Sequence, residues 1–268
     1  MTSSKNILVF TDLDGTLIDH DTYSWEPARE SIEMLKGARI PIIPCTSKTR
    51  AEIEFYRRGM GLEDPFISEN GGGIFIPKEY FDFNFDYDKE VGNYKVIELG
   101  MSYGDIRRAL DEMRSFGDIT GFGDMSVEEV ARDTGLSLEE ARMAKEREYD
   151  EAFIFSGDEE GLKRAIKKAG LRWTKGGRYW HIMGNNDKGK AVRILTGLFA
   201  KKLGSVQTVG LGDSLNDLPM LEAVEIPILV QKKDGSYDAR VDVPGLIKTD
   251  APGPEGWAKA VRSLFPAV

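Results

Sequence analysis

Three short apolar runs in this chain lead directly into polar side chains that can bind ions. The runs cover residues 7–10, 40–45 and 208–211. The polar residues that follow them are Asp12 and Asp14, Thr46 and Ser47, and Asp213 and Asp217. Apolar runs of this length are typical of strands buried on both faces, as in a parallel sheet. Ligands of open α/β sheets bind beyond the carboxyl ends of the strands. The pattern therefore predicts that these polar groups meet at one edge of a sheet.

Segments with the character of strands and helices alternate in the first 80 residues and again after residue 187. Helices are expected over residues 27–36, 50–58 and 188–203, and residues 226–230 are expected to form the last core strand. In the third helix the inward-facing residues are expected to be Ala191, Ile194, Leu195, Leu198 and Phe199. This alternation predicts an α/β fold with a Rossmann-like, doubly wound parallel core.

The segment between the two core stretches has a different texture and predicts an inserted α+β module. A strand is expected at 94–99, and a helix over 103–116 has its apolar residues at helical spacing. Ser126 and Ser137 each precede a glutamate by three residues, the pattern of a capping box that starts a helix. A further strand (152–155), a helix (158–169) and a hairpin around 175–178 complete the module. We expect a core domain of residues 1–83 and 186–268 and a cap domain of residues 84–185.

The composition excludes several classes of function. Lys and Arg number 36 against 45 Asp and Glu, for a net charge of −9, which disfavours binding to nucleic acid and to anionic membranes. The single cysteine excludes an intramolecular disulfide and favours a reducing compartment. Apolar runs of the roughly 20 residues needed to cross a bilayer do not occur, and residues 1–6 lack the apolar region of a signal peptide. We therefore expect a soluble cytoplasmic protein.

The predicted sheet edge collects groups that suit a phosphate and a hard cation. Carboxylates on a rigid frame, together with a substrate phosphate, are the usual ligands of Mg²⁺ in proteins. The Thr46 hydroxyl, the Lys188 ammonium and backbone N–H groups near Gly15 could bind phosphate oxygens. Lys188 falls in the first turn of its predicted helix, where the dipole disfavours a cation, so we expect it to have a functional partner.

Four motifs in order resemble those of the haloacid dehalogenase superfamily of phosphohydrolases. They are DLDGT at residues 12–16, Thr46, Lys188, and GDSLND at residues 212–217. The resemblance implies a Rossmann-like core, and an α+β insertion between the second and third motifs is similar to the large type-two (C2B) cap. More narrowly, TSKT at 46–49, ENGGG at 69–73, GGRYWH at 176–181 and GPEGW at 253–257 resemble the mannosyl-3-phosphoglycerate phosphatases. This implies a phosphatase that converts mannosyl-3-phosphoglycerate, or a close glycosyl analogue, to the glycosylglycerate and phosphate.

The resemblance also implies catalytic roles. Asp12 would attack phosphorus and become an aspartyl phosphate. Asp14 would protonate the leaving alkoxide and then activate water. Lys188 and Thr46 would stabilise the transferring phosphoryl group.

A metal site is implied by the same resemblance. Mg²⁺ would be held by Asp12, the backbone carbonyl of Asp14 and Asp213. Asp217 would orient either the water shell of the metal or Lys188. Asn216 would touch the phosphate or a metal-bound water.

Substrate contacts are expected from both domains. The candidates are Ser47, Lys48, Asn70, Gly71, Arg178, His181 and Asn216. Among them, Arg178 and His181 of the cap are expected to point to the same side of a strand, toward the glycerate carboxylate or the sugar.

Each of these assignments has a plainer interpretation. Asp12 and Asp14 fit an ordinary Asp-Gly turn, Thr46 fits a helix N-cap, and residues 69–73 fit a flexible hairpin. His181 fits a packed strand histidine as well as a ligand. The acidic run 146–151 reads as a solvated helix end, Cys45 as a small core residue and Trp257 as a docking anchor.

Alternative functions also stay open from the residues alone. A broader sugar-phosphate phosphatase and a phosphomutase share the same motifs. A non-catalytic phosphate-binding module would need a decayed core, but all of the acidic motif positions are occupied.

Overall fold

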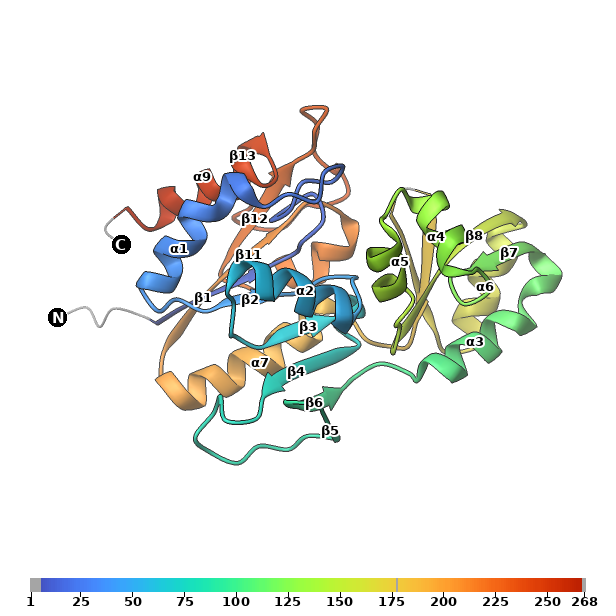
Figure 1. Cartoon of the computed structure of the whole chain (residues 1–268), viewed down its shortest axis with the longest axis horizontal. Helices are drawn as coiled ribbons and strands as arrows, with labels where there is room; N and C mark the ends of the chain where they lie inside the picture. The colour runs from blue at the N-terminus through green and yellow to red at the C-terminus, as the bar shows by residue number, and fades with distance from the viewer. Residues whose placement is uncertain (1–5, 177, 267–268) are drawn as a thin grey trace.

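The central sheet of the computed structural model has five parallel strands in the order β13-β12-β11-β1-β2 (Figure 1). The structure describes residues 6–176 and 178–266. The strands are β1 (Asn6–Thr11), β2 (Ile42–Pro44), β11 (Val206–Gly212), β12 (Ile226–Gln231) and β13 (Ile247–Pro252). The chain leaves β1 toward β2 and later fills the other side with β11, β12 and β13. This reversal of strand order confirms the predicted doubly wound core.

Helices cover both faces of this sheet because its strands are apolar on both sides. The helices are α1 (Arg29–Gly37), α2 (Arg50–Met60), α7 (Lys188–Leu203), α8 (Leu218–Leu221) and α9 (Glu255–Leu264). Val9 of β1 packs in the cluster that contains α1, α2 and α9, whereas Leu8 and Phe10 pack in the cluster that contains α7 and α8. Of the residues of α7 that were expected to face inward, Ile194 does not, since it is 37% exposed; the prediction is confirmed for the other four.

A second sheet continues the core beyond β2, in the order β3-β4-β6-β5. Its strands are β3 (Phe66–Ser68), β4 (Gly73–Pro77), β5 (Lys89–Val91) and β6 (Tyr94–Glu98). A parallel bridge between Cys45 and Ile67 joins it to the end of β2. The expected strand at 94–99 exists, but it pairs with β4 and not with the inserted module, because Val96 is buried opposite Phe75.

The central sheet also has one more strand than the sequence predicted. Residues 226–230 were expected to be the last core strand, but β13 adds an edge strand beyond β12. Only Thr249 and Ala251 of β13 are buried. An edge strand pairs on one side only and tolerates polar residues, so its sequence lacks the continuous apolar signal of the inner strands.

The inserted module is an antiparallel sheet with helices on both faces, to the right in Figure 1. The strand order is β7-β8-β10-β9, with β7 at Gly117–Gly121, β8 at Asp150–Gly157, β9 at Arg172–Gly176 and β10 at Tyr179–Met183. Helices α3 (Tyr103–Glu112) and α6 (Glu159–Lys168) cover one face, and α4 (Val127–Thr134) and α5 (Leu138–Ala144) cover the other. The predicted α+β character is confirmed, whereas the domain boundaries stay a prediction.

Local signals in the module match the structure. Ser126 and Ser137 are the N-caps of α4 and α5, and each forms a complete capping box. Strands β9 and β10 pair as the expected hairpin. Gly177, which belongs to the motif at 176–181, lies outside the described residues.

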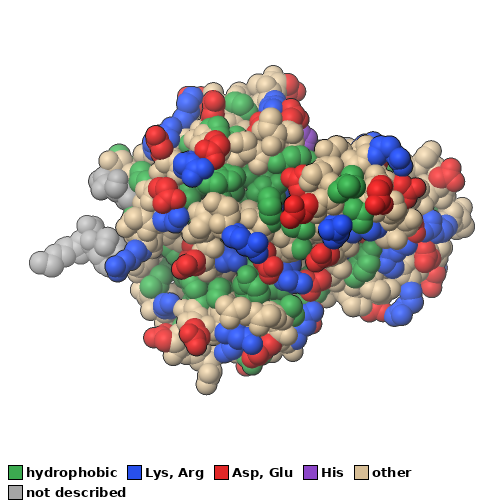
Figure 2. Space-filling view, in the orientation of Figure 1, with side chains coloured by type: hydrophobic (Ala, Val, Ile, Leu, Met, Phe, Trp, Pro, Cys, Tyr) green, Lys and Arg blue, Asp and Glu red, His purple; other side chains and the backbone are tan. Residues whose placement is uncertain are grey.

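The described surface carries both signs of charge. On the face shown in Figure 2, acidic and basic side chains are interspersed over both parts of the molecule. Among the described residues, none of the helices is both long enough and apolar enough to cross a membrane.

Candidate active site

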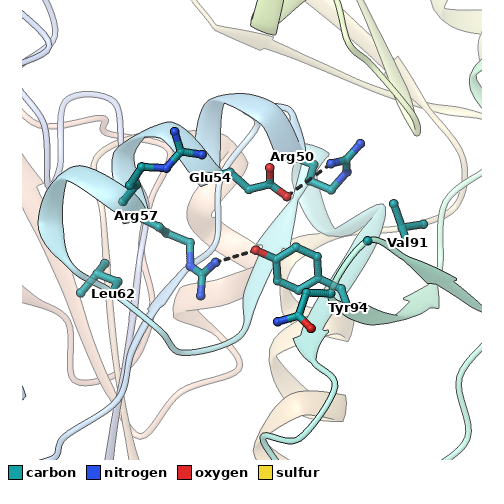
Figure 3. A pocket seen from close by; sticks show the side chains of 9 residues that line it. Arg50, Glu54, Arg57, Leu62, Val91 and Tyr94 are labelled. Atoms are coloured by element: carbon teal, nitrogen blue, oxygen red, sulfur yellow. Dashed lines mark hydrogen bonds and ion pairs between the residues drawn. The ribbon is translucent and has the colours of Figure 1, made fainter.

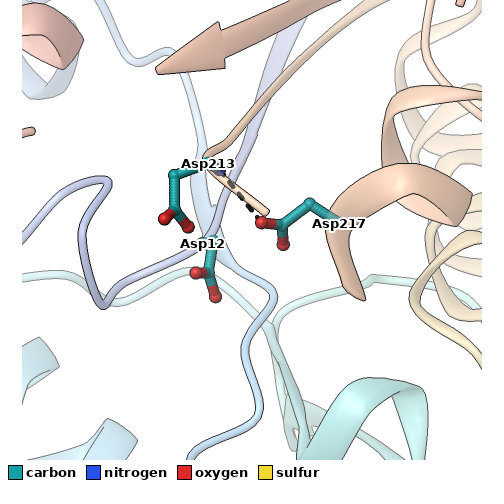
Figure 4. Close-up of side chains that lie close together, drawn as sticks. All are labelled: Asp12, Asp213 and Asp217. Atoms are coloured by element: carbon teal, nitrogen blue, oxygen red, sulfur yellow. Dashed lines mark hydrogen bonds between the residues drawn. The ribbon is translucent and has the colours of Figure 1, made fainter. Parts of the chain in front are cut away.

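The carboxyl ends of β1 and β11 bring three carboxylates together, as Figure 4 shows. The Asp12 backbone N–H donates to the Leu211 carbonyl at 2.9 Å, so Asp12 leaves β1 beside the end of β11. One ligand oxygen each from Asp12, Asp213 and Asp217 lies within 4.8 Å of the others. The strand-end pattern in the sequence therefore predicted this convergence correctly.

Lys188 lies fully buried at the start of α7 and contacts two of these carboxylates. Its Nζ is 2.9 Å from Oδ1 of Asp12 and 2.6 Å from Oδ1 of Asp217. Burial by itself lowers the pKa of Lys188, but the carboxylates of Asp12 and Asp217 outweigh burial and raise that pKa above its ordinary value. The cation that opposes the helix dipole thus has its expected partners.

Asp217 also holds the loop that carries Asp213. Its Oδ2 accepts backbone hydrogen bonds from Asp213 at 3.0 Å and Ser214 at 3.1 Å. Burial and the Asp12 carboxylate raise the pKa of Asp217 to about 6, although Lys188 opposes the shift. Burial and the carboxylates of Asp217 and Asp12 likewise raise the pKa of Asp213 well above its ordinary value. Both oxygens of Asp217 are engaged by the protein, which suits it to positioning its neighbours.

Asp14 points to a different partner, the ammonium group of Lys48. The Nζ of Lys48 lies 3.1 Å from Oδ1 of Asp14 and 3.3 Å from Oε1 of Glu52. Burial raises the pKa of Asp14 even though Lys48 lowers it, and the Asp12 carboxylate adds to the rise. The side chain of Asp14 therefore lies outside the cluster of Asp12, Asp213 and Asp217.

The loop after β2 places Thr46 and Ser47 beside this pair. Thr46 is fully buried, and its Oγ1 accepts the Lys48 backbone N–H at 3.3 Å. The interpretation of Thr46 as a helix N-cap is wrong, because Thr49 caps α2 in a capping box with Glu52.

The motif at residues 69–73 is a buried turn and not a flexible hairpin. Glu69, Asn70 and Gly71 all have positive φ values of 45°, 55° and 88°. A Cβ on Gly71 would lie 2.3 Å from the Asp187 carbonyl oxygen, so only glycine lets this turn meet the start of α7. The turn thereby supports the backbone that carries Lys188.

Asn70 begins a hydrogen-bonded chain that crosses from the core to the inserted module. Its Oδ1 accepts from Asn216 at 3.3 Å, and its Nδ2 donates to Oδ2 of Asp150 at 3.2 Å. The same Asp150 oxygen lies 3.1 Å from Nδ1 of His181. His181, predicted as a ligand, is therefore oriented by a buried carboxylate.

The sequence predicts that residues 146–151 form a solvated helix end, but charged side chains of this segment are buried. Asp150 is fully buried, and the buried guanidinium of Arg147 contacts its carboxylate and donates to the Ser47 carbonyl at 2.8 Å. The Glu69 carboxylate accepts backbone hydrogen bonds from Glu148, Tyr149 and Asp150 at 2.8 to 3.1 Å. The apolar run at residues 152–155, which follows directly, is the local signal of a strand in this segment.

Arg178 is not brought to the acidic cluster. It is 3.0 Å from Asp133 of α4, and it donates to the Tyr179 hydroxyl at 2.9 Å. Arg178 lies in the turn before β10 and not on the strand itself, so the expectation that Arg178 and His181 point the same way stays a prediction. Cys45 is a buried core residue, and Trp257 anchors α9 by donating to Oγ1 of Thr11 at 3.0 Å, as expected for both.

Replacing Asp150 with Asn is expected to destabilise the protein at neutral pH by about 1.5–3 kcal/mol, the value of hydrogen bonds to a charged group. Burial raises the pKa of Asp150, but Arg147 and His181 outweigh it and lower that pKa below its ordinary value. The carboxylate therefore stabilises the fold above about pH 4, and this stabilisation is lost as pH falls through the pKa of the folded state. Urea unfolding midpoints of both proteins should converge as pH falls below about 4; a difference that stays constant would contradict the assignment.

Comparisons with known proteins agree with this geometry. Residues 9–91 match the family of haloacid dehalogenase-like hydrolases. A glucosyl-3-phosphoglycerate/mannosyl-3-phosphoglycerate phosphatase of Methanococcoides burtonii is 54% identical over 263 residues, which cover 96% of this chain and 97% of that protein. An enzyme of the same name from Persephonella marina is 43% identical, with 97% of each chain covered. A mannosyl-3-phosphoglycerate phosphatase of Pyrococcus horikoshii is 42% identical over 90% of this chain and 99% of its own length.

Solved structures share the fold at lower identity. A phosphatase of the same superfamily from Bacteroides thetaiotaomicron, BT1666, superposes with a TM-score of 0.68 at 18% identity, over 100% of this chain and 97% of the other. A subclass IIB sugar phosphatase, BT4131, gives a TM-score of 0.67 at 19% identity, over 97% and 99% of the two chains. Together with the nearly full-length relatives, these results place the chain among the haloacid dehalogenase-like hydrolases, as a phosphatase that hydrolyses phosphoric monoesters.

Proposed function

We propose that the protein hydrolyses mannosyl-3-phosphoglycerate, or the glucosyl analogue, to the glycosylglycerate and phosphate. The observation that carries the chemistry is the cluster of Asp12, Asp213 and Asp217 around the buried ammonium of Lys188. The substrate class is supported by the names of relatives that are 54% and 43% identical over nearly the whole chain.

Asp12 is the proposed nucleophile. It is held at the end of β1, and Lys188 contacts Oδ1 of its carboxylate. An attack by Oδ2 on phosphorus would form an aspartyl phosphate and release the alkoxide, so that hydrolysis proceeds as two displacements. Lys188 and the Thr46 hydroxyl are placed to offset the negative charge of the transferring phosphoryl group.

The acidic cluster fits a divalent cation. The three carboxylates, whose ligand oxygens lie within 4.8 Å of one another, carry more negative charge than the single ammonium group of Lys188 can neutralise. Carboxylates placed this close together are stabilised by a further positive charge. Oxygen ligands are those that Mg²⁺ prefers. Asp12, Asp213 and the backbone carbonyl of Asp14 would hold Mg²⁺, and Asp217 would position Lys188 and the Asp213 loop. When bound, the ion neutralises charge between nucleophile and phosphate.

Asp14 is the proposed general acid and base. Its raised pKa favours the protonated form that a leaving alkoxide requires. Once the alcohol has left, the same carboxylate can accept a proton from the water that attacks the phosphoenzyme. Lys48, 3.1 Å away, would fix the orientation of this side chain.

The substrate end of the site would draw on both parts of the chain. In this proposal Ser47, Gly71 and Asn216 would contact the phosphate side of the substrate, and Lys48 and Asn70 would contact the leaving group. His181, oriented by Asp150, is the candidate ligand of the glycerate carboxylate from the inserted module, which we propose acts as a cap over the core. Arg178 stays a candidate for the same carboxylate. The single, buried cysteine supports a reducing, cytoplasmic location.

Phosphate release across a panel of esters, with and without Mg²⁺, tests this function. Mannosyl- and glucosyl-3-phosphoglycerate should be hydrolysed at least about 100-fold more efficiently than hexose phosphates, since a pocket that pairs the glycerate carboxylate is penalised when that group is missing. Chelation of divalent ions should abolish turnover, and added Mg²⁺ should restore it. A flat profile would indicate a broad sugar-phosphate phosphatase, transfer of phosphate between sugars would indicate a phosphomutase, and inactivity with every ester would indicate a binding module.

A further inference from the structure

Two surface hollows border α2, and they differ in the residues that line them. The first, about 440 Å³, lies between α2 and the turn from β5 to β6 (Figure 3). Two of its guanidinium groups are engaged, since Arg50 is 3.3 Å from Glu54 and Arg57 donates to the Tyr94 hydroxyl at 3.1 Å. This hollow contains none of the proposed catalytic residues.

The second hollow, about 400 Å³, has four aromatic rings among the nine residues that line it. The rings are Tyr23, Trp25, Phe55 and Tyr56. Glu140 of α5, in the inserted module, contributes a carboxylate to the same wall. A concave site of this size, with aromatic walls and a few polar groups, is typical of small-ligand pockets. It is the hollow in which the core and the inserted module both take part.

This aromatic pocket adjoins the proposed general acid through Lys48. The Nζ of Lys48 is 3.1 Å from the Asp14 carboxylate, 5.2 Å from the centre of the Tyr23 ring and 5.5 Å from that of Tyr56. Burial raises the pKa of Tyr23, Lys48 lowers it, and the carboxylates of Asp14 and Glu140 raise it further. The Tyr23 phenol is therefore influenced by charges of the proposed catalytic site, Lys48 and Asp14, and by the Glu140 carboxylate of the pocket. A leaving group that is protonated by Asp14 would extend toward these rings.

Resting on the proposed function, we propose that the aromatic pocket binds the pyranose ring of the glycosyl-3-phosphoglycerate. In a glycosyl-3-phosphoglycerate the phosphate is on C3 of the glycerate and the sugar is on the oxygen of C2, so the sugar belongs to the leaving group. Lys48 contacts Asp14 and lies near the rings of the pocket. A pyranose presents an apolar C–H face, which the rings of Tyr23, Trp25 and Tyr56 can cover, and hydroxyls at its edge, which the phenols and Glu140 can bind.

Glu140 makes the pocket depend on the position of the inserted module. Its Oε2 accepts the Ser137 backbone N–H at 2.9 Å in the capping box of α5, which fixes the carboxylate beside the helix start. The aromatic rings belong to the core, so the sugar would contact both parts at once. Sugar binding would therefore favour the arrangement of core and module seen here.

The test compares Trp25→Ala with Trp173→Ala on two esters. Trp173 is a matched control, because it is 39% exposed on β9 and does not line the pocket. Mannosyl-3-phosphoglycerate carries the sugar, and 3-phosphoglycerate, used as substrate or competing inhibitor, does not. Trp25→Ala should lower kcat/KM for the sugar ester at least about tenfold, in the range of a lost pocket contact, and leave the sugar-free ester within about twofold. Trp173→Ala should change neither.

Two conservative variants keep the assignment testable if Trp25→Ala does not fold. Tyr56→Phe removes only a hydroxyl, and Glu140→Gln retains the capping oxygen of α5; each should lower kcat/KM for the sugar ester selectively. Equal losses on both esters, or no loss on either, would overturn the subsite. If the wild-type enzyme prefers another sugar phosphate, the proposed substrate is wrong. The sugar subsite would still stand if Trp25→Ala lowered kcat/KM selectively for that preferred ester. A wild-type enzyme that does not distinguish sugar-bearing from sugar-free esters would overturn both.

Discussion

Asp12→Asn is expected to abolish phosphate release, with kcat reduced by about 10⁴-fold or more, because an amide cannot attack phosphorus as the carboxylate does. The substitution preserves the size of the side chain, and the amide oxygen can still accept a hydrogen bond from Lys188. The fold should therefore survive. Initial rates with mannosyl-3-phosphoglycerate at saturating Mg²⁺, beside circular dichroism of both proteins, measure the two expectations together.

A matched control for this variant is Asp21→Asn, a change of the same type at an exposed aspartate that pairs with Lys233 at the surface. It should retain full activity. Substantial turnover by Asp12→Asn would show that another group attacks phosphorus.

Lys188→Met is expected to lower both stability and activity. Lys188 is the buried cation between Asp12 and Asp217, and its removal leaves two carboxylates without their partner. Breaking a buried ion pair from one side costs about 3–5 kcal/mol, so the urea midpoint should fall accordingly. Loss of the charge that faces the phosphoryl group should also lower kcat/KM by about 10²- to 10³-fold, as for removal of a single oxyanion donor.

The double variant Lys188→Met/Asp217→Asn separates electrostatics from packing. If uncompensated charge causes the loss, neutralising Asp217 should recover part of the stability while activity stays low. Arg193→Met removes an exposed cation from the same helix, α7, and should change the unfolding free energy by no more than about 0.5 kcal/mol. If the double variant is no more stable than Lys188→Met, the lost stability comes from packing and not from uncompensated charge.

The core of the site could be predicted from the sequence because few arrangements satisfy the pattern. Apolar runs such as residues 7–10 must be buried on both faces, and parallel neighbours then place Asp12 and Asp213 at the same sheet edge. Lys188 was identifiable because a cation in the first turn of a helix opposes the helix dipole, which indicates a functional partner. These inferences required only strand polarity and helix electrostatics.

Contacts between the two parts of the chain could not be predicted in this way. Asp150 pairs with Asn70 across 80 residues of sequence, and Glu69 binds three backbone N–H groups of residues 148–150. Local composition makes such an acidic run look solvated, since its partners come from distant segments. The pairing of Arg178 with Asp133 was missed for the same reason, whereas β13 was missed because an edge strand lacks the continuous apolar signal of an inner strand.

Chemical trapping of the phosphoenzyme tests the central claim most directly. Enzyme quenched during turnover of mannosyl-3-phosphoglycerate and treated with borohydride should carry homoserine at residue 12, because the reagent reduces an aspartyl phosphate to the alcohol. Peptide mass spectrometry should find this change only when substrate and Mg²⁺ are both present. An unmodified Asp12 peptide with the reduced or phosphorylated site at another residue would contradict the assignment of Asp12 as the nucleophile.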